Sequence, residues 1–145
     1  MKTGFIGLGR MGRGMAARLH AAGHDLVLFD VSDTAGADLV AAGAGRAASP
    51  AALARDCDLV FTSLPTPADV MAVCHGPDGL AEGFRKGTTW FDLTTNSLSV
   101  VRDLHTEMAA RGVQFLDAPV SGGPGGAASG KRQAGDLGGR RQGRV

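Results

Sequence analysis

The sequence predicts an α/β fold in which helices cover both faces of a parallel β-sheet, that is, a doubly wound sheet. Three observations support this prediction. Short apolar runs recur along the chain, the segments between them have helical spacing, and a glycine-rich turn joins the first run to the first helix. At 145 residues the chain has the length of one domain. Right-handed crossovers in such a sheet place ligands beyond the carboxyl ends of the strands.

Five strands are expected where apolar runs are bounded by turn residues. They are TGFIGL (3–8), DLVLFD (25–30), DLVFTSLP (58–65), TTWFDL (88–93) and VQFLDAP (113–119). A regular alternation of strands and helices requires one more strand within residues 43–48, although the residues there, GAGRAA, have little strand character.

Three helices are expected from apolar residues at helical spacing. They are MGRGMAARLHAAG (11–23), SPAALARDC (49–57) and LSVVRDLHTEMAARG (98–112). Gly23 and Gly112 end the first and the third of them. The second begins with Ser49 as N-cap and Pro50 at the first helical position, a pair typical of a helix start.

The distribution of charge and of cysteine limits the kinds of partner that the protein can have. Residues 1–130 carry 10 basic and 13 acidic residues, and residues 131–145 carry 5 basic and 1 acidic. The mildly acidic body argues against a nucleic-acid footprint, and short basic tails are usually just solvated, so no nucleic-acid partner is expected. Cys57 and Cys74 lie outside any metal-ligand spacing and are expected to be reduced, so no metal site is expected.

The hydropathy pattern predicts a cytoplasmic protein without a membrane partner. The apolar N-terminal run is broken by Arg10 and Arg13 before it reaches the length of a signal peptide, and no small-residue cleavage site follows. No stretch approaches the length of a membrane span.

The segment between the first strand and the first helix spells G-x-G-x-x-G, the pattern of a turn that binds the pyrophosphate of a dinucleotide. Its residues are Gly7, Leu8, Gly9, Arg10, Met11 and Gly12. Gly7 allows the tight turn, Gly9 lets the backbone approach the pyrophosphate, and Gly12 lets the helix pack close to the strand. The pyrophosphate then lies at a helix N-terminus, where free N–H groups favour an anion. Arg10 could face solvent or pair with a phosphate, and the sequence leaves both open.

Asp30 ends the second expected strand, where a carboxylate accepts hydrogen bonds from the hydroxyls of the adenosine ribose. The same carboxylate would repel a 2′-phosphate. NAD is therefore the expected cofactor, with NADP as the alternative. If the turn binds no dinucleotide, it only packs, and Asp30 is a strand-end cap.

Four segments resemble the β-hydroxyacid dehydrogenase family in their order and spacing. They are GFIGLGRMGRGMAARL, LPTPADV, FDLTTNS and FLDAPVSGG, and the resemblance covers Lys2 to about Gly130. The family includes 3-hydroxyisobutyrate dehydrogenase, tartronate semialdehyde reductase and, more distantly, 6-phosphogluconate dehydrogenase. The resemblance implies the Rossmann form of the doubly wound sheet. It also implies an NAD(P)-dependent oxidoreductase that acts on the CH–OH group of a small hydroxyacid or on a semialdehyde.

The resemblance also implies roles for individual residues. Leu64 and Pro65 are similar to the loop that lies against the cofactor, and Thr95 is similar to the hydroxyl residue at the nicotinamide end. The loop that binds the substrate carboxylate, through a hydroxyl and backbone N–H groups, is similar to Ser121, Gly122 and Gly123. Without the resemblance, Pro65 could be a strand terminator, Thr95 a helix-cap residue and Ser121 a turn residue.

The chain departs from the family pattern at two places. Ser97-Leu98 follows the D-x-S-T element, where the family often has proline, which leaves the substrate preference open. The family's acid/base lysine stands on a long helix after the nucleotide-binding domain, whereas Lys131 lies in a glycine-rich segment without a helical pattern. Because hydride transfer needs a group that moves a proton, we expect a truncated dehydrogenase without its catalytic lysine. We expect it to be inactive alone and to lack the helical domain through which family members oligomerise.

Residues 1–123 are accordingly expected to form an NAD(P)-binding domain, and residues 124–145 a Gly/Arg-rich, disordered tail. From Gly130 onward the residues can be encoded with the unit GGCAAGC twice in succession. Removal of one copy makes the same bases read Gly-Lys-Leu-Ala-Thr-Trp-Val-Gly-Gly-Asp, which resembles the family's next strand, so a frameshift is expected. The alternative function is a free-standing NAD-binding sensor or partner-binding module. Such a protein should carry an amphipathic element at its C-terminus, and residues 121–145 have none.

Overall fold

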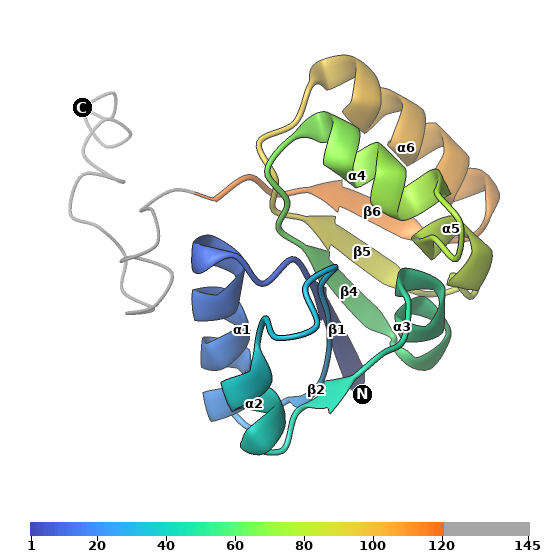
Figure 1. Cartoon of the computed structure of the whole chain (residues 1–145). Helices are drawn as coiled ribbons and strands as arrows, with labels where there is room; N and C mark the ends of the chain where they lie inside the picture. Colours follow the sequence, from blue (N-terminus) through green and yellow to red (C-terminus); the bar gives the residue numbers. More distant parts are fainter. Residues whose placement is uncertain (121–145) are drawn as a thin grey trace, which may run out of the picture.

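A computed structural model describes residues 1–120 and confirms the doubly wound parallel sheet (Figure 1). All six strands pair in parallel, in the order β3-β2-β1-β4-β5-β6. The strands are β1 (Lys2–Ile6), β2 (Asp25–Phe29), β3 (Gly45–Arg46), β4 (Leu59–Thr62), β5 (Thr89–Asp92) and β6 (Gln114–Asp117). The order reverses between β1 and β4, which is where a doubly wound sheet opens a crevice for a ligand.

Six helices lie between these strands. They are α1 (Arg10–Ala21), α2 (Ala37–Ala41), α3 (Pro50–Asp56), α4 (Pro67–His75), α5 (Leu80–Gly83) and α6 (Leu98–Ala110). None of these helices is long and apolar enough to cross a membrane. The substrate loop predicted at residues 121–123 and the tail predicted at residues 124–145 lie outside the described residues.

The sequence prediction locates the strands well but misses three helices, the short α2 and α5 and the longer α4. Strand β4 ends at Thr62, three residues before the proline that was expected to end it. Helix α4 follows, and the sequence analysis did not anticipate it. Its start carries a recognisable signal, because the Thr66 hydroxyl accepts a hydrogen bond from the Asp69 N–H at 3.2 Å and Pro67 occupies the first turn.

The helices divide between the two faces of the sheet (Figure 1). One face is covered by α3, α4, α5 and α6, which contribute Leu53, Val70, Leu80 and Leu104 to one core cluster. The other face is covered by α1 and α2, which contribute Ala16 and Leu39 to a second cluster. This division is the expected result of right-handed crossovers that run first in one direction along the sheet and then in the other.

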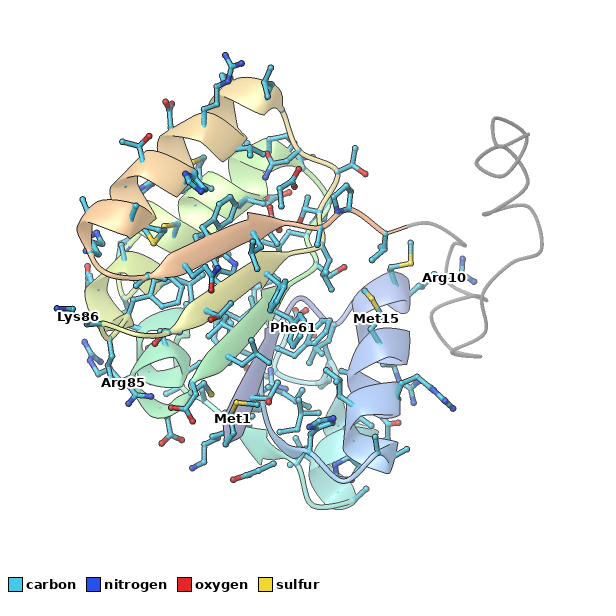
Figure 2. All side chains as sticks on the ribbon, turned by 180° about the vertical axis from the view of Figure 1, so that it is seen from behind. Met1, Arg10, Met15, Phe61, Arg85 and Lys86 are labelled. Atoms are coloured by element: carbon cyan, nitrogen blue, oxygen red, sulfur yellow. The ribbon has the colours of Figure 1, made fainter. Side chains whose placement is uncertain are left out.

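An apolar row crosses four strands on the face that α1 covers. Phe5, Phe61, Phe91 and Leu116 occupy matching positions on β1, β4, β5 and β6. The first two rings stack at 6.0 Å between centroids, and the second and third at 5.3 Å. Figure 2 views the molecule from this side and shows Phe61 near α1. The row ties the central strands together beneath the loops of the carboxyl edge.

Candidate functional site

The site begins at the turn between β1 and α1, where two glycines are required by the packing of the protein itself. Gly7 has φ +95°, in the left-handed region, and a methyl group there would overlap the carbonyl oxygen of Ser63. A methyl group at Gly12 would overlap the carbonyl oxygen of Gly7. The turn is therefore pressed between the first turn of α1 and the end of β4.

Gly9 differs from these two glycines. A methyl group at Gly9 would meet no atom of the described residues within 4 Å, and Gly9 lines an open cleft. Gly9 is also the N-cap of α1, which has no side-chain cap and no acidic residue in its first turn. By contrast, α3, α4 and α6 are capped by hydroxyl side chains. The N-terminus of α1 thus presents backbone N–H groups to a cleft in which an anion can approach closely.

The carboxylate of Asp30 braces the glycine turn. Its two oxygens accept hydrogen bonds from the backbone N–H of Leu8 at 2.7 Å and of Ser32 at 2.9 Å. An ionised carboxylate has about four acceptor positions, and the Asp30 side chain is only half-buried. Acceptor capacity therefore remains on Asp30 for hydroxyl groups of a ligand in the cleft.

Arg46, on the short strand β3, holds the loop that follows Asp30. Its guanidinium donates to the carbonyl oxygens of Ala35 and Ser32, both at 2.6 Å, and of Asp30 at 3.3 Å. Sequence reasoning missed this residue because its partners lie 11 to 16 positions earlier in the chain. An arginine in a segment of poor strand character was the available signal.

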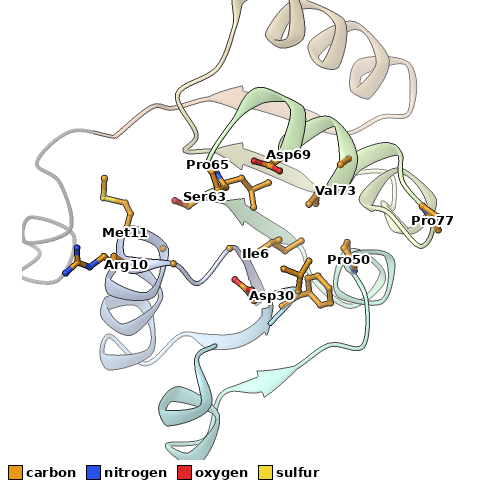
Figure 3. Close-up of a pocket in the computed structure, with 17 residues that line it drawn as sticks. Ile6, Arg10, Met11, Asp30, Pro50, Ser63, Pro65, Asp69, Val73 and Pro77 are labelled. Carbon is orange, nitrogen blue, oxygen red and sulfur yellow. The ribbon is translucent and has the colours of Figure 1, made fainter. Parts of the chain in front are cut away.

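The cleft has a volume of about 650 Å³ and lies between the glycine turn, the end of β2 and the first turns of α4 (Figure 3). Eight of the predicted cofactor residues line it: Gly7, Gly9, Arg10, Met11, Gly12, Asp30, Leu64 and Pro65. The remaining lining residues are Ile6, Phe29, Val31, Pro50, Ser63, Asp69, Ala72, Val73 and Pro77. The cleft is therefore apolar over most of its wall, with polar groups concentrated near the glycine turn, as is typical of a ligand site.

Leu8 and Thr95, the other predicted cofactor residues, are not part of the cleft lining. The Leu8 side chain is 5 % exposed and packs into the core beneath α1 and α2, so only its backbone contributes, through the bond to Asp30. Thr95 is exposed in the loop after β5. Its neighbour Thr94 is buried, and the Thr94 hydroxyl oxygen accepts the Leu64 N–H at 3.0 Å.

A buried polar cluster lies behind this part of the cleft, and sequence reasoning missed it as well. Asp92 is fully buried and accepts hydrogen bonds from the Thr62 hydroxyl at 2.9 Å and from the Asn96 amide at 2.6 Å. The indole N–H of Trp90 donates to Thr62 Oγ1 at 2.9 Å. The signal in the sequence was the run DLTTN, which places polar residues directly after a buried strand.

Three further titratable groups have pKa values raised by their surroundings. Burial raises the pKa of the Cys57 and Cys74 thiols to about 12, and both cysteines are free. Burial also raises the pKa of Asp117, at the end of β6, and the Asp92 carboxyl adds to this effect. Within residues 1–120, no group of three histidine, cysteine or acidic side chains could hold a metal ion.

Known proteins resemble the chain over most of its described length. The family described as the NAD binding domain of 6-phosphogluconate dehydrogenase matches residues 2–136. Mitochondrial 3-hydroxyisobutyrate dehydrogenase of Drosophila melanogaster is 44% identical over 124 residues, which are 86% of this chain and 38% of the relative. The chain thus spans well under half the length of this curated relative.

Solved structures agree with the sequence relatives. The 3-hydroxyisobutyrate dehydrogenase of Mycobacterium tuberculosis, solved with L-serine, superposes with a TM-score of 0.79 at 38% identity, over 88% of this chain and 43% of that one. Psf3, solved in complex with NADP+ and 2-OPP, gives a TM-score of 0.84 at 34% identity, over 88% and 45%. The chain therefore belongs to the family of the NAD binding domain of 6-phosphogluconate dehydrogenase.

Proposed function

We propose that the cleft binds NAD with the pyrophosphate at the first turn of α1 and the adenosine ribose at Asp30. Gly9 carries this proposal. No contact among the described residues requires a glycine at this position. Gly9 lines the cleft at the N-terminus of α1, which has no side-chain cap. A close approach of ligand phosphate to the backbone explains why a side chain is absent there.

The other residues predicted to bind the cofactor would then contact different parts of the dinucleotide. Arg10 is exposed at the mouth of the cleft, where it could pair with a phosphate oxygen. Leu64 and Pro65 would lie against the cofactor, and Thr95 would face the nicotinamide end. When bound, NAD supplies a nicotinamide ring that accepts or gives a hydride.

The choice of NAD over NADP rests on Asp30. Its carboxylate is fixed by two backbone amides, so it cannot turn away from a 2′-phosphate without losing them. Repulsion between the two anions would disfavour NADP, even though Psf3 was solved with that cofactor. We therefore expect this chain to bind NAD more tightly than NADP.

We further propose that this domain serves a dehydrogenase of small 3-hydroxyacids, such as 3-hydroxyisobutyrate, with Ser121, Gly122 and Gly123 binding the substrate carboxylate. The named relatives support this substrate class. The charged groups that line the described cleft are Arg10, Asp30 and Asp69. Arginine stays protonated, and none of these groups is a counterpart of the acid/base lysine that the family resemblance implies, so we expect the chain by itself to turn over hydroxyacids at background rates.

Calorimetric titration of the 145-residue chain with NAD and with NADP tests the proposal. NAD should bind more tightly, and Asp30→Ala should narrow the difference between the two cofactors by about tenfold, the size of one charge-assisted contact. Tighter binding of NADP by the wild-type chain would contradict the assignment of Asp30. Turnover of 3-hydroxyisobutyrate at about 1 per second or faster, a rate typical of enzymes, would contradict the expected inactivity.

A further inference from the structure

Asp92 is the most deeply buried acidic group of the described residues, and the cleft does not include it. Its side chain, at the end of β5, has no exposure to solvent. Within residues 1–120 no lysine or arginine pairs with it. A buried carboxyl group without a cation must be stabilised by hydrogen-bond donors, so the identity of its donors shows what it holds in place.

Three donors surround the Asp92 carboxyl group. Oδ1 accepts the Thr62 hydroxyl at 2.9 Å and the Thr94 N–H at 3.2 Å. Oδ2 accepts the Asn96 amide at 2.6 Å. The Thr94 backbone N–H can only donate, and the Asn96 amide is oriented by its own Oδ1, which accepts the Ser97 N–H at 3.0 Å. Asp92 is therefore an acceptor at both oxygens.

This network reaches the wall of the cleft through Thr94. The Thr94 hydroxyl oxygen accepts the Leu64 N–H at 3.0 Å, and Leu64 lines the cleft. A methyl group at Gly7 would lie 3.1 Å from Leu64 Cδ2 and would overlap the Ser63 carbonyl oxygen. The wall thus lies in direct contact with the glycine turn, and a small displacement of Leu64 would change the width of the cleft.

We propose that Asp92 is a positioning residue for the dinucleotide site. By fixing Thr94 it holds Leu64 and Ser63 against the glycine turn at the separation that the cofactor needs. Thr62 and Trp90 support the same carboxyl group from the core side. This inference rests on the proposed function for the meaning of the cleft, but the hydrogen-bond chain that carries it is a property of the protein alone.

Asp92→Asn is the sharpest test because it keeps the shape and removes one acceptor. Whichever way the new amide turns, its NH₂ group faces a donor, either the Asn96 amide or the Thr94 backbone N–H. Asn96 cannot simply flip, because its Oδ1 already accepts the Ser97 N–H at 3.0 Å. Amide hydrogen exchange at Leu64 should become about tenfold faster, and NAD should bind about tenfold more weakly, as expected for one or two disrupted buried hydrogen bonds. The emission of Trp90, the single tryptophan, should also shift.

Two further variants complete the experiment. Thr94→Val removes the acceptor for Leu64 but keeps the backbone N–H that Asp92 accepts, so Leu64 exchange and NAD binding should change while Trp90 emission stays the same. Asp58→Asn is the matched control. Asp58 also ties strands together, since it accepts the Lys2 N–H at 3.1 Å, but it precedes β4 at the opposite edge of the sheet. It should leave Leu64 exchange and NAD affinity unchanged.

The results separate the possible outcomes. A folded Asp92→Asn variant with wild-type Leu64 exchange overturns the proposal, as does faster exchange spread evenly over all amides, which would indicate a merely structural role. If Asp92→Asn does not fold, the Thr94→Val variant decides instead. The proposal is overturned if the Leu64 amide exchanges in that variant at the wild-type rate. If the wild-type chain fails to bind NAD, the proposed function is wrong, and Leu64 exchange still decides whether Asp92 positions the wall.

Discussion

The two edges of the sheet use aspartate in opposite surroundings. At the amino edge, Asp56 and Asp58 are exposed and pair with Lys2 at 3.0 Å and with Arg85 at 3.3 Å. At the carboxyl edge, Asp92 is fully buried and Asp30 is half-buried, and both accept hydrogen bonds from hydroxyl, amide or backbone groups.

This difference indicates where the protein requires accurate geometry. Exposed ion pairs are weak, because water competes for both charges and the side chains lose freedom when they pair. Buried polar groups must be matched by donors at fixed positions, or the fold loses stability. Substitutions at the carboxyl edge should therefore alter ligand binding strongly, whereas substitutions at the amino edge should have small effects on stability alone.

The largest effects are expected from two glycines of the same turn. Substitution of Gly12 should lower the stability of the fold, and substitution of Gly9 should lower the affinity for NAD. Gly12→Ala places a methyl group on the Gly7 carbonyl oxygen, which cannot move aside. It should destabilise the fold by about 3 kcal/mol, the upper part of the usual range for overpacking. Gly9→Ala places its methyl group in open space, so the melting temperature should stay the same or rise slightly. NAD affinity should nevertheless fall at least about tenfold, the loss of one strong polar contact.

Thermal unfolding and calorimetric titration of both variants check this pair. A loss of stability in Gly9→Ala equal to that in Gly12→Ala would show that Gly9 serves packing. Unchanged NAD affinity in a folded Gly9→Ala variant would remove the main support for a pyrophosphate at the start of α1.

An intermediate effect is expected from Arg46, which holds the loop after Asp30. Arg46→Met keeps the aliphatic stem but removes the donors to three carbonyl oxygens. NAD affinity should fall by about fivefold, which corresponds to the net contribution of one hydrogen bond. The preference for NAD over NADP should narrow, because Asp30 is then less firmly placed. Arg55→Met, which changes an exposed arginine on α3, is the control and should leave both quantities unchanged.

The smallest effect is expected at the amino edge, and it should depend on pH. The Lys2 backbone N–H, with a further contribution from Arg85, holds the pKa of Asp58 below its usual value. Because the pKa is lower in the folded state than in the unfolded chain, Asp58 stabilises the fold above about pH 4. That contribution disappears as the pH falls through the folded-state pKa. Melting temperatures of wild type and Asp58→Asn should therefore differ slightly at pH 6 and converge toward pH 3, and a difference that grows on acidification would contradict this assignment.

The local pattern of the sequence was sufficient for most strands of the fold and for helices α1, α3 and α6. Strands β1, β2, β4, β5 and β6 were located because buried parallel strands are short, apolar and bounded by turn residues. Strand β3 was expected only because a regular alternation of strands and helices requires it. The start of α3 was predicted correctly from Ser49 and Pro50, since a capping side chain bonds only to the next few residues: Ser49 accepts the Ala52 N–H at 3.1 Å. The glycine turn and Asp30 were found for the same reason, because their spacing follows from one strand–helix–strand unit.

The sequence determined these local features, and the tertiary structure alone decided which distant residues they meet. The Asp30 carboxylate reaches the Leu8 N–H across 22 positions, and Thr62 reaches Asp92 across 30. Leu64 meets Thr94 across another 30. These partners follow from the strand order and the register of the sheet, which bring the carboxyl ends of β1, β2, β4 and β5 side by side. Hydrogen bonds act over about 3 Å, so a pattern along the chain cannot specify them until packing has fixed which strands are neighbours.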